Sequence, residues 1–231
     1  MQTTVSFSKT PKLKARTAIV LVGEGGKLTD KGGALDKETK GALTHFIKTS
    51  PNFTGKAGQI AVVPGPQKFK FDRIVMLGMG KPDKITLDEI TAMGGRFSAA
   101  FGGMNIEAAQ FIADGFKSFK AVSADEAASA FASGFVLRAY SFDKYKTKAK
   151  DDKTPKGLKV EFVLDAATKA SALFKSEKAV ADGVHFARDL VNEPPNLLYP
   201  ASMATRVKSE LAPLGVKVEV IDEKKMDQLG F

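Results

Sequence analysis

Short apolar runs that end before glycine or proline alternate with longer amphipathic stretches in the first part of the chain, and this alternation is the strongest constraint on its fold. The runs Thr17 to Val22, Gln59 to Val63 and Arg73 to Leu77 are short and apolar. Runs of this kind, bounded by turn residues, are typical of buried strands. Ile106 to Ile112 and Leu158 to Leu164, the second with polar residues at alternate positions near its start, predict two further strands.

Three amphipathic stretches predict helices, over Leu35 to Thr49, Thr86 to Phe101 and Ser123 to Tyr140. The last two open with Thr or Ser followed three residues later by Glu, which is the pattern of a helix capping box. Strands that alternate with helices indicate an α/β domain whose mostly parallel or mixed sheet is covered by helices on both faces. We expect this domain to close near Asp165.

The chain changes character after this domain. Thr168 to Val191 is expected to form one long linker helix, which Pro194 and Pro195 end because proline lacks an amide donor and restricts the residue before it. Beyond the prolines we expect the opening of a second α/β unit: a helix from Pro200 through Leu211, a strand over Val216 to Ile221, and a short helix over Glu223 to Leu229 capped by Asp222.

One strand and about two helices are too few to close a core of their own, because units below about 40 residues usually need disulfides, metals or partners. We therefore expect the chain to stop inside a domain and to be part of a longer protein. The expected division is an N-terminal α/β domain over residues 1–165, a linker helix over 166–192, and the beginning of a second domain over 193–231.

Composition excludes several classes of protein. Hydrophobic residues make up 43% and charged residues 26% of the 231 positions, as in folded domains rather than disordered or fibrous chains. Cysteine is absent, so disulfides, thiolate nucleophiles and cysteine-bound zinc are impossible, which fits a reducing compartment. The N-terminal residues lack the apolar segment of a signal peptide, and no apolar run approaches a membrane span. We therefore expect a cytoplasmic protein without membrane contact.

The surplus of positive over negative charge is confined to the first part of the chain. Residues 1–150 carry 23 Lys and Arg against 13 Asp and Glu, whereas the remainder is close to balance within the net charge of +9. Lysine recurs at Lys144, Lys146, Lys148 and Lys150, and aromatic residues stand at the start of this run. Lysines neutralise phosphates and aromatic rings stack on bases, so these four lysines are a candidate polyanion contact, with a solvated loop as the alternative.

The sequence offers almost no material for a catalytic or metal site. His45 and His185, the only histidines, fall in different predicted helices, which leaves little for a histidine-based metal site or a Ser-His-Asp triad. Glycine turns at 23–26, 32–33 and 78–81 follow predicted strands, where backbone amides could hold phosphate. Without a Walker or Gly-x-Gly-x-x-Gly pattern, plain turns are the favoured interpretation. We therefore assign no catalytic, cofactor-binding or metal-binding residue.

One longer motif carries a family resemblance. The segment from Asp182 to Asn196 reads Asp-Gly-Val-His-Phe-Ala-Arg-Asp-Leu-Val-Asn-Glu-Pro-Pro-Asn. It closely resembles the interdomain region of the leucyl aminopeptidases, the cytosol aminopeptidase family. Leu214 to Val220 and Lys225 to Gly230 look like the family's first catalytic-domain strand and the helix after it. Val75 to Lys81 and Tyr140 to Thr147 resemble a strand-end turn and a helix-end motif of its N-terminal domain.

This resemblance implies a macro-domain-like N-terminal α/β domain, a linker helix and a C-terminal peptidase domain, assembled as a hexamer in the cytoplasm. It also implies a hydrolase that removes N-terminal amino acids from peptides with two divalent metal ions, commonly manganese, zinc or magnesium, which polarise the scissile carbonyl and activate water. The family's metal-binding stretch, Asn-Thr-Asp-Ala-Glu-Gly-Arg-Leu, does not occur in this chain. We therefore expect the chain alone to be inactive and to serve oligomer assembly and access to the active site.

A binding module is the alternative function. In that interpretation the N-terminal α/β domain stands alone and holds DNA or a nucleotide through its basic face, with the lysine run as the contact. The unfinished second α/β unit favours the aminopeptidase interpretation.

Overall fold

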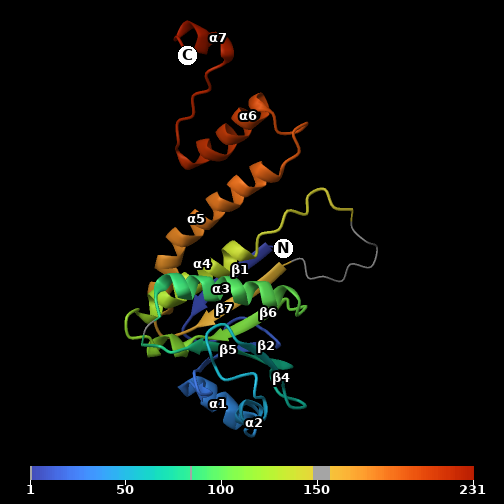
Figure 1. The fold of residues 1–231 in the computed structure, drawn as a ribbon, viewed down its shortest axis with the longest axis vertical. Coiled ribbons are helices and arrows are strands. Elements are labelled where there is room, and N and C mark those ends of the chain that lie inside the picture. Colours follow the sequence, from blue (N-terminus) through green and yellow to red (C-terminus); the bar gives the residue numbers. More distant parts are fainter. Residues whose placement is uncertain (1, 84, 148–156) are drawn as a thin grey trace. The chain divides into compact units, whose positions relative to one another are not determined.

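The computed structural model describes residues 2–83, 85–147 and 157–231 (Figure 1). The chain forms two compact units, Met1–Val184 and His185–Phe231. None of the helices in the described ranges combines the length and apolar character needed to cross a membrane. The strands of the first unit are β1 (Gln2–Ser8), β2 (Thr17–Gly23), β3 (Lys27–Leu28), β4 (Ile60–Pro64), β5 (Arg73–Gly80), β6 (Ala108–Ile112) and β7 (Gly157–Val163). Its helices are α1 (Asp30–Glu38), α2 (Ala42–Thr49), α3 (Leu87–Gly102), the 3-10 helix η1 (Asp114–Ser118), α4 (Ala124–Arg138) and the first part of α5 (Ala167–Asn192).

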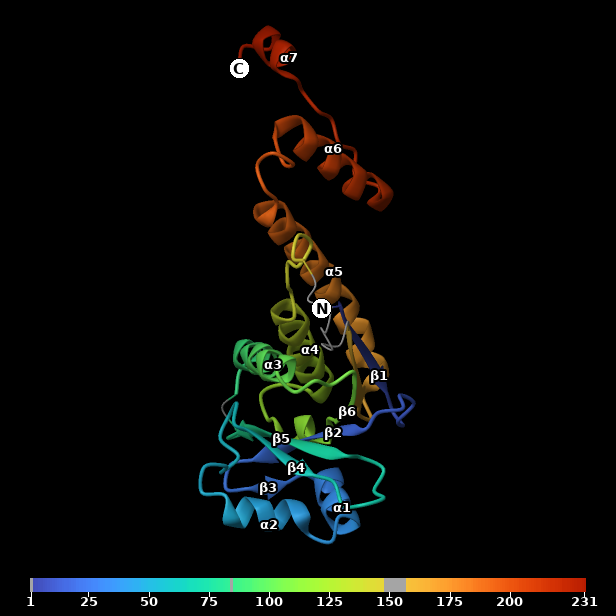
Figure 2. The same cartoon turned by 90° about the vertical axis from the view of Figure 1, so that its right-hand side faces the viewer.

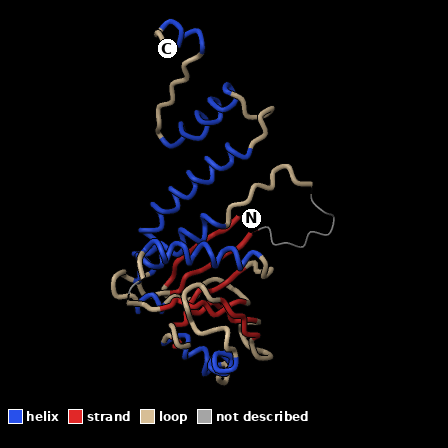
Figure 3. Tube along the Cα trace, viewed as in Figure 1, coloured by secondary structure: helices blue, strands red, loops and turns tan. Residues whose placement is uncertain are grey.

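The strands form one mixed sheet in the order β1-β7-β6-β2-β5-β4. Neighbours from β1 to β5 in this order run parallel, whereas β4 is antiparallel to β5 and the short β3 is antiparallel to β2. In Figure 3 the strands gather between helices on either side. The predicted α/β fold with a mixed sheet flanked by helices is therefore confirmed.

The central strand β2 is buried at all seven positions. Its side chains alternate between two cores: Ile19 and Leu21 belong to one, and Ala18 and Val20 to the other. The helices α3 and α4 lie on the first face and α1 and α2 on the second (Figures 1 and 2). A parallel strand needs cover on both faces, which explains why the sequence of β2 is a continuous apolar run without alternation.

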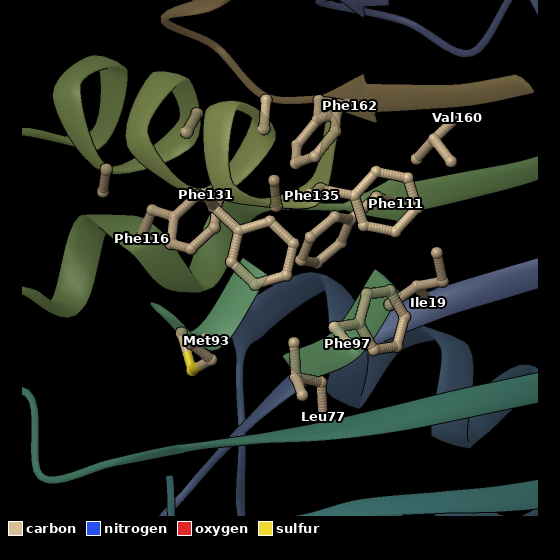
Figure 4. Packing of buried hydrophobic residues seen from close by; sticks show 14 of the residues in the cluster. Ile19, Leu77, Met93, Phe97, Phe111, Phe116, Phe131, Phe135, Val160 and Phe162 are labelled. Carbon is tan, nitrogen blue, oxygen red and sulfur yellow. The ribbon is translucent and has the colours of Figure 1, made fainter. Parts of the chain in front are cut away.

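Phenylalanine rings fill the core between the sheet and the helices α3 and α4 (Figure 4). Phe111 of β6 lies with its ring centroid 4.8 Å from that of Phe162 of β7 and 5.1 Å from that of Phe131 of α4. The ring centroid of Phe97 in α3 lies 6.0 Å from that of Phe135 in α4. These tilted and edge-to-face contacts are the arrangements that aromatic pairs favour, and they join strands and helices that lie far apart in the sequence.

The helices α3 and α4 approach each other closely because each carries a glycine at the crossing. A Cβ atom on Gly94 of α3 would lie 2.0 Å from the carbonyl oxygen of Phe131, and one on Gly134 of α4 would lie 1.9 Å from that of Thr91. The two glycines therefore bring backbone against backbone. Gly94 weakens the helix by propensity, but it is required where the neighbouring helix passes.

The capping boxes predicted from the sequence are confirmed. Thr86 caps α3 and Ser123 caps α4, and in each case the side chain of the Glu three residues later, Glu89 or Glu126, accepts the amide of the cap residue. The hydrogen bond from Ser123 lowers the pKa of the Glu126 carboxyl. The reciprocal bonds satisfy amide donors that the first helical turn leaves without an intrahelical partner.

The prediction of a single helix over Leu35 to Thr49 is wrong. The chain there forms two helices, because Lys40 and Gly41 adopt left-handed φ angles of 57° and 83°. The Gly41 amide donates to the Asp36 carbonyl at 2.8 Å, while the Asp36 carboxylate accepts the Leu43 amide at 2.8 Å. Asp36 thus ends α1 with its backbone and begins α2 with its side chain. The spacing of apolar residues was helical on both sides of the break, so periodicity alone did not reveal it.

Two further features of the first unit differ from expectation. No strand is expected before Thr17, whereas β1 pairs in parallel with β7 at the edge of the sheet. The pair Gly32 and Gly33 was expected in a turn but lies in α1, whose cap residue Thr29 accepts the Gly32 amide at 3.1 Å. The turn that precedes α1 in the chain lies at residues 24–26, directly after β2.

The second unit contains the end of α5, the helix α6 (Pro200–Leu211), the 3-10 helix η2 (Ala212–Leu214) and α7 (Glu223–Gln228). The long helix expected over Thr168 to Val191 and its end before the prolines are confirmed, and so is the cap at Asp222, which accepts the Lys225 amide at 2.8 Å. The prediction of a strand over Val216 to Ile221 is wrong. This segment is irregular, because residues 185–231 contain no other strand with which it could pair.

Replacement of Gly134 by Ala tests the glycine crossing. We expect Gly134→Ala to lower the free energy of unfolding by about 1–3 kcal/mol, because the added methyl group overlaps a backbone carbonyl. Gly95→Ala is the matched control, since its Cβ would have no neighbour closer than 3.5 Å and alanine favours the helix by about 0.5–1 kcal/mol. Urea unfolding measures both variants. A Gly134→Ala variant as stable as Gly95→Ala would contradict the close crossing.

Candidate functional site

Two hollows on the first unit combine strand ends with polar residues. One, of about 740 Å³, lies where β2 and β5 end and includes glycines of the turns at 23–26 and 78–81. The other, of about 840 Å³, lies between α1 and residues 9–16, the segment that joins β1 to β2. Crevices beside a sheet are common ligand sites in α/β proteins, so both hollows are candidates.

The glycine turns are engaged with the protein's own backbone. The segment 54–59 lies against them, and its carbonyl oxygens accept the amides of Gly25, Gly78 and Gly80 at 2.8–2.9 Å. A Cβ atom on Gly55 would lie 2.1 Å from the carbonyl oxygen of the first turn glycine, so glycine is needed there for close approach. Because these amides already have acceptors, they form no phosphate cradle. This agrees with the interpretation of the glycines as plain turns.

The second hollow is strongly cationic. Six of its seventeen lining residues are Lys or Arg and one, Glu38, is acidic. Arg16 is paired with Asp72, whose carboxyl has a lowered pKa because of that hydrogen bond. Glu38 lies 2.7 Å from Lys70. The hollow therefore keeps a positive surplus even after its ion pairs are formed.

A buried carboxylate holds one wall of this hollow. Glu161 of β7 is only 3% exposed and accepts the amides of Lys12 and Leu13, each at 2.9 Å. Gln110, beside it on β6, donates its side-chain amide to the Leu13 carbonyl at 2.6 Å. The polar residues at alternate positions near the start of β7 do not by themselves reveal this role of Glu161. The available signal was a Glu that follows Lys159 on a strand whose other side chains are apolar.

The predicted polyanion contact is only partly within the described residues. Lys144 and Lys146 are described, whereas Lys148 and Lys150 lie outside the described residues. The Lys146 ammonium lies 2.6 Å from Asp143, and this pairing lowers the pKa of the Asp143 carboxyl. The Lys144 ammonium lies 5.3 Å from the centroid of the Tyr145 ring. The structure thus brings one lysine to an acidic residue and one to an aromatic ring.

The described residues do not fit a metal centre. No three His, Asp or Glu side chains gather in those parts of the chain. His45 lies in α2 and His185 in α5, in different units. The two-metal centre implied by the family resemblance therefore has no ligand set among these residues.

The motif from Asp182 to Asn196 forms the end of α5 and a turn. Glu193 follows the helix with its side chain only 1% exposed, and Arg206 of α6 donates to its carboxylate at 2.8 Å. This pair joins the turn to α6 within the second unit. The Glu of the Asn-Glu-Pro-Pro motif therefore has a structural role, which the sequence analysis did not assign.

Comparison with known proteins identifies the family of the chain. The family model described as the cytosol aminopeptidase family, N-terminal domain, matches residues 19–149. The "probable cytosol aminopeptidase" of Rhizobium etli is 39% identical over 235 residues, which cover 98% of this chain and 44% of that protein. That of Agrobacterium fabrum is 40% identical over 232 residues with the same coverage. The chain thus spans about 44% of the length of these relatives.

Solved structures share the fold. A mutant of tomato leucine aminopeptidase matches with a TM-score of 0.77 at 20% identity, over all of this chain and 46% of the tomato chain. The bottromycin maturation enzyme BotP, solved in complex with Mn, matches with a TM-score of 0.67 at 21% identity, over 94% of this chain and 40% of the BotP chain. The fold and its similarity to these structures identify the chain as an α/β protein like the N-terminal part of a leucine aminopeptidase. The chain belongs to the cytosol aminopeptidase family.

Replacement of Glu161 by Gln tests the anchoring of residues 9–16. We expect Glu161→Gln to lower the free energy of unfolding by about 1–3 kcal/mol, because its amide group would face backbone donors while buried. Hydrogen exchange of the Lys12 and Leu13 amides should also accelerate. The control is Glu107→Gln, at an exposed position just before β6. Equal effects of the two variants on stability and exchange would contradict the anchoring role.

Proposed function

We propose that this chain is the N-terminal portion of a leucyl-type metallo-aminopeptidase, a hydrolase that removes N-terminal amino acids from peptides. The observation that carries the proposal is the match to cytosol aminopeptidases at 39–40% identity over nearly the whole chain. The fold shared with leucine aminopeptidase supports it. The aminopeptidase activity is proposed for the whole protein on the basis of this similarity to its relatives.

The proposed domain division follows the sequence analysis. Residues 1–165 would form the N-terminal domain, 166–192 the linker helix and 193–231 the beginning of the peptidase domain. The end of β7 at Val163 and the extent of α5, Ala167–Asn192, support these limits. The buried Glu193, paired with Arg206, supports a role of the motif as the first turn of the following domain.

Catalysis would depend on two divalent metal ions, manganese, zinc or magnesium, which supply a Lewis acid and an activated water. The solved structure of BotP with Mn supports manganese among these. The family's metal-binding stretch does not occur in this sequence, so we assign the chain no catalytic residue. Its role would be assembly of a cytoplasmic hexamer and control of access to the active site.

Activity measurements test this assignment. We expect the protein encoded by the complete gene to hydrolyse leucine p-nitroanilide with Mn²⁺, to lose activity with a chelator and to regain it when Mn²⁺ is restored. The 231-residue chain should show no hydrolysis under the same conditions. Hydrolysis by the 231-residue chain, or an inactive complete protein with all three metals, would contradict the proposal.

A second candidate function is binding of DNA or a nucleotide through the basic face of the N-terminal domain. The surplus of positive charge in residues 1–150 supports it, and so does the Lys144 ammonium near the Tyr145 ring. The candidate contact consists of Lys144, Lys146, Lys148 and Lys150.

Salt dependence of DNA binding tests this second candidate. If it is correct, changing the four lysines together to Glu should flatten the dependence of log K on log salt, by about 0.9 for each phosphate that the protein no longer neutralises. The control reverses four exposed lysines elsewhere, at Lys169, Lys175, Lys208 and Lys217. Binding that is absent, insensitive to salt or equally weakened by the control would exclude the lysine run as the contact.

A further inference from the structure

The hollow between α1 and residues 9–16 lies over a part of the sheet that no helix of the described residues covers on that face. Side chains of β6 and β7 alternate: Phe111 and Phe162 point into the core beneath α3 and α4, whereas Gln110 and Glu161 point to the opposite face. There α1 and α2 cover β2 and its neighbours. The segment 9–16 crosses the remaining strands and leaves a hollow of about 840 Å³ beside α1.

The segment presents three lysines to this hollow. Lys9, Lys12 and Lys14 are exposed, and no carboxylate among the described residues lies within 4 Å of their ammonium groups. Lys31 approaches Asp165 only at 4.0 Å. The buried Glu161 holds the backbone of the segment by accepting the Lys12 and Leu13 amides. Like charges held near one another repel, and a bound anion would relieve this repulsion.

The floor of the hollow has a different character. It is formed by apolar side chains, among them Leu35, Phe71 and Val163, each at most 5% exposed. A cationic rim around an apolar floor matches a ligand with an acidic group at one end and an apolar or aromatic body at the other. The volume of the hollow, about 840 Å³, falls in the range of about 300–1,000 Å³ that is usual for small-molecule sites.

We propose that this hollow binds a small amphipathic organic anion, with its acidic group at Lys9, Lys12 and Lys14 and its apolar body on the floor beside Leu35. Neither Lys144 nor Lys146 of the lysine run lines this hollow. The concave shape and apolar floor favour a small molecule over a nucleic acid, whose charged backbone would gain nothing from the floor.

Fluorescence titration with 8-anilinonaphthalene-1-sulfonate tests the site in the folded 231-residue chain. This probe joins an aromatic body to a sulfonate, and we expect saturable binding at one site. N-phenyl-1-naphthylamine, which lacks the sulfonate, should bind at least about tenfold more weakly. The double variant Lys12→Glu with Lys14→Glu should weaken binding of the sulfonate about tenfold or more, because attraction to the rim becomes repulsion.

The double variant Lys169→Glu with Lys175→Glu is the matched control, since it makes the same change of charge at exposed positions of α5 outside the hollow. Thermal unfolding verifies that each variant is folded. Displacement of the probe by adenosine monophosphate would assign a phosphate ligand, and displacement by decanoate a carboxylate. Equal binding of the neutral probe, equal loss in the control, or displacement by duplex DNA but by neither small anion would overturn the proposal.

Discussion

Complete burial of β2 is the constraint on which the rest of the first unit depends. A strand whose seven residues are all buried must have a packed layer on each face of its sheet. The two layers meet this requirement differently. On one face α3 and α4 cross at Gly94 and Gly134 and press phenylalanine rings onto the strands. On the other, the short helices α1 and α2 cover only part of the sheet.

The unequal cover leaves a hollow lined by residues 9–16 beside α1. Where the described residues place no helix, the segment 9–16 lies over β6 and β7, and its backbone needs partners from the sheet. Glu161 and Gln110 supply them. A buried carboxylate that accepts backbone amides is stabilised by those donors, and it directs the neighbouring lysines outward. The same contact thus completes the fold and creates a cationic hollow.

Kinship and geometry account for different parts of this protein. Membership of the cytosol aminopeptidase family explains the fold and the Asn-Glu-Pro-Pro motif, in which Glu193 binds Arg206 at the start of the second unit. Geometry shows that glycine turns near β2 and β5 serve close backbone packing, since their amides are bonded to the segment 54–59. The described residues contain no group of side chains that could bind the metal ions proposed for peptide hydrolysis.

The sequence by itself determined the elements whose causes are local. Apolar runs located β2 and β5, the capping boxes began α3 and α4 at the right residues, and two prolines ended α5. Only the tertiary structure decided the break at Gly41, the irregular course of Val216 to Ile221 and the burial of Glu161. These depend on partners distant in the chain or on backbone conformations that periodicity does not encode, so the candidate hollow, unlike the fold class, could not be predicted from the sequence.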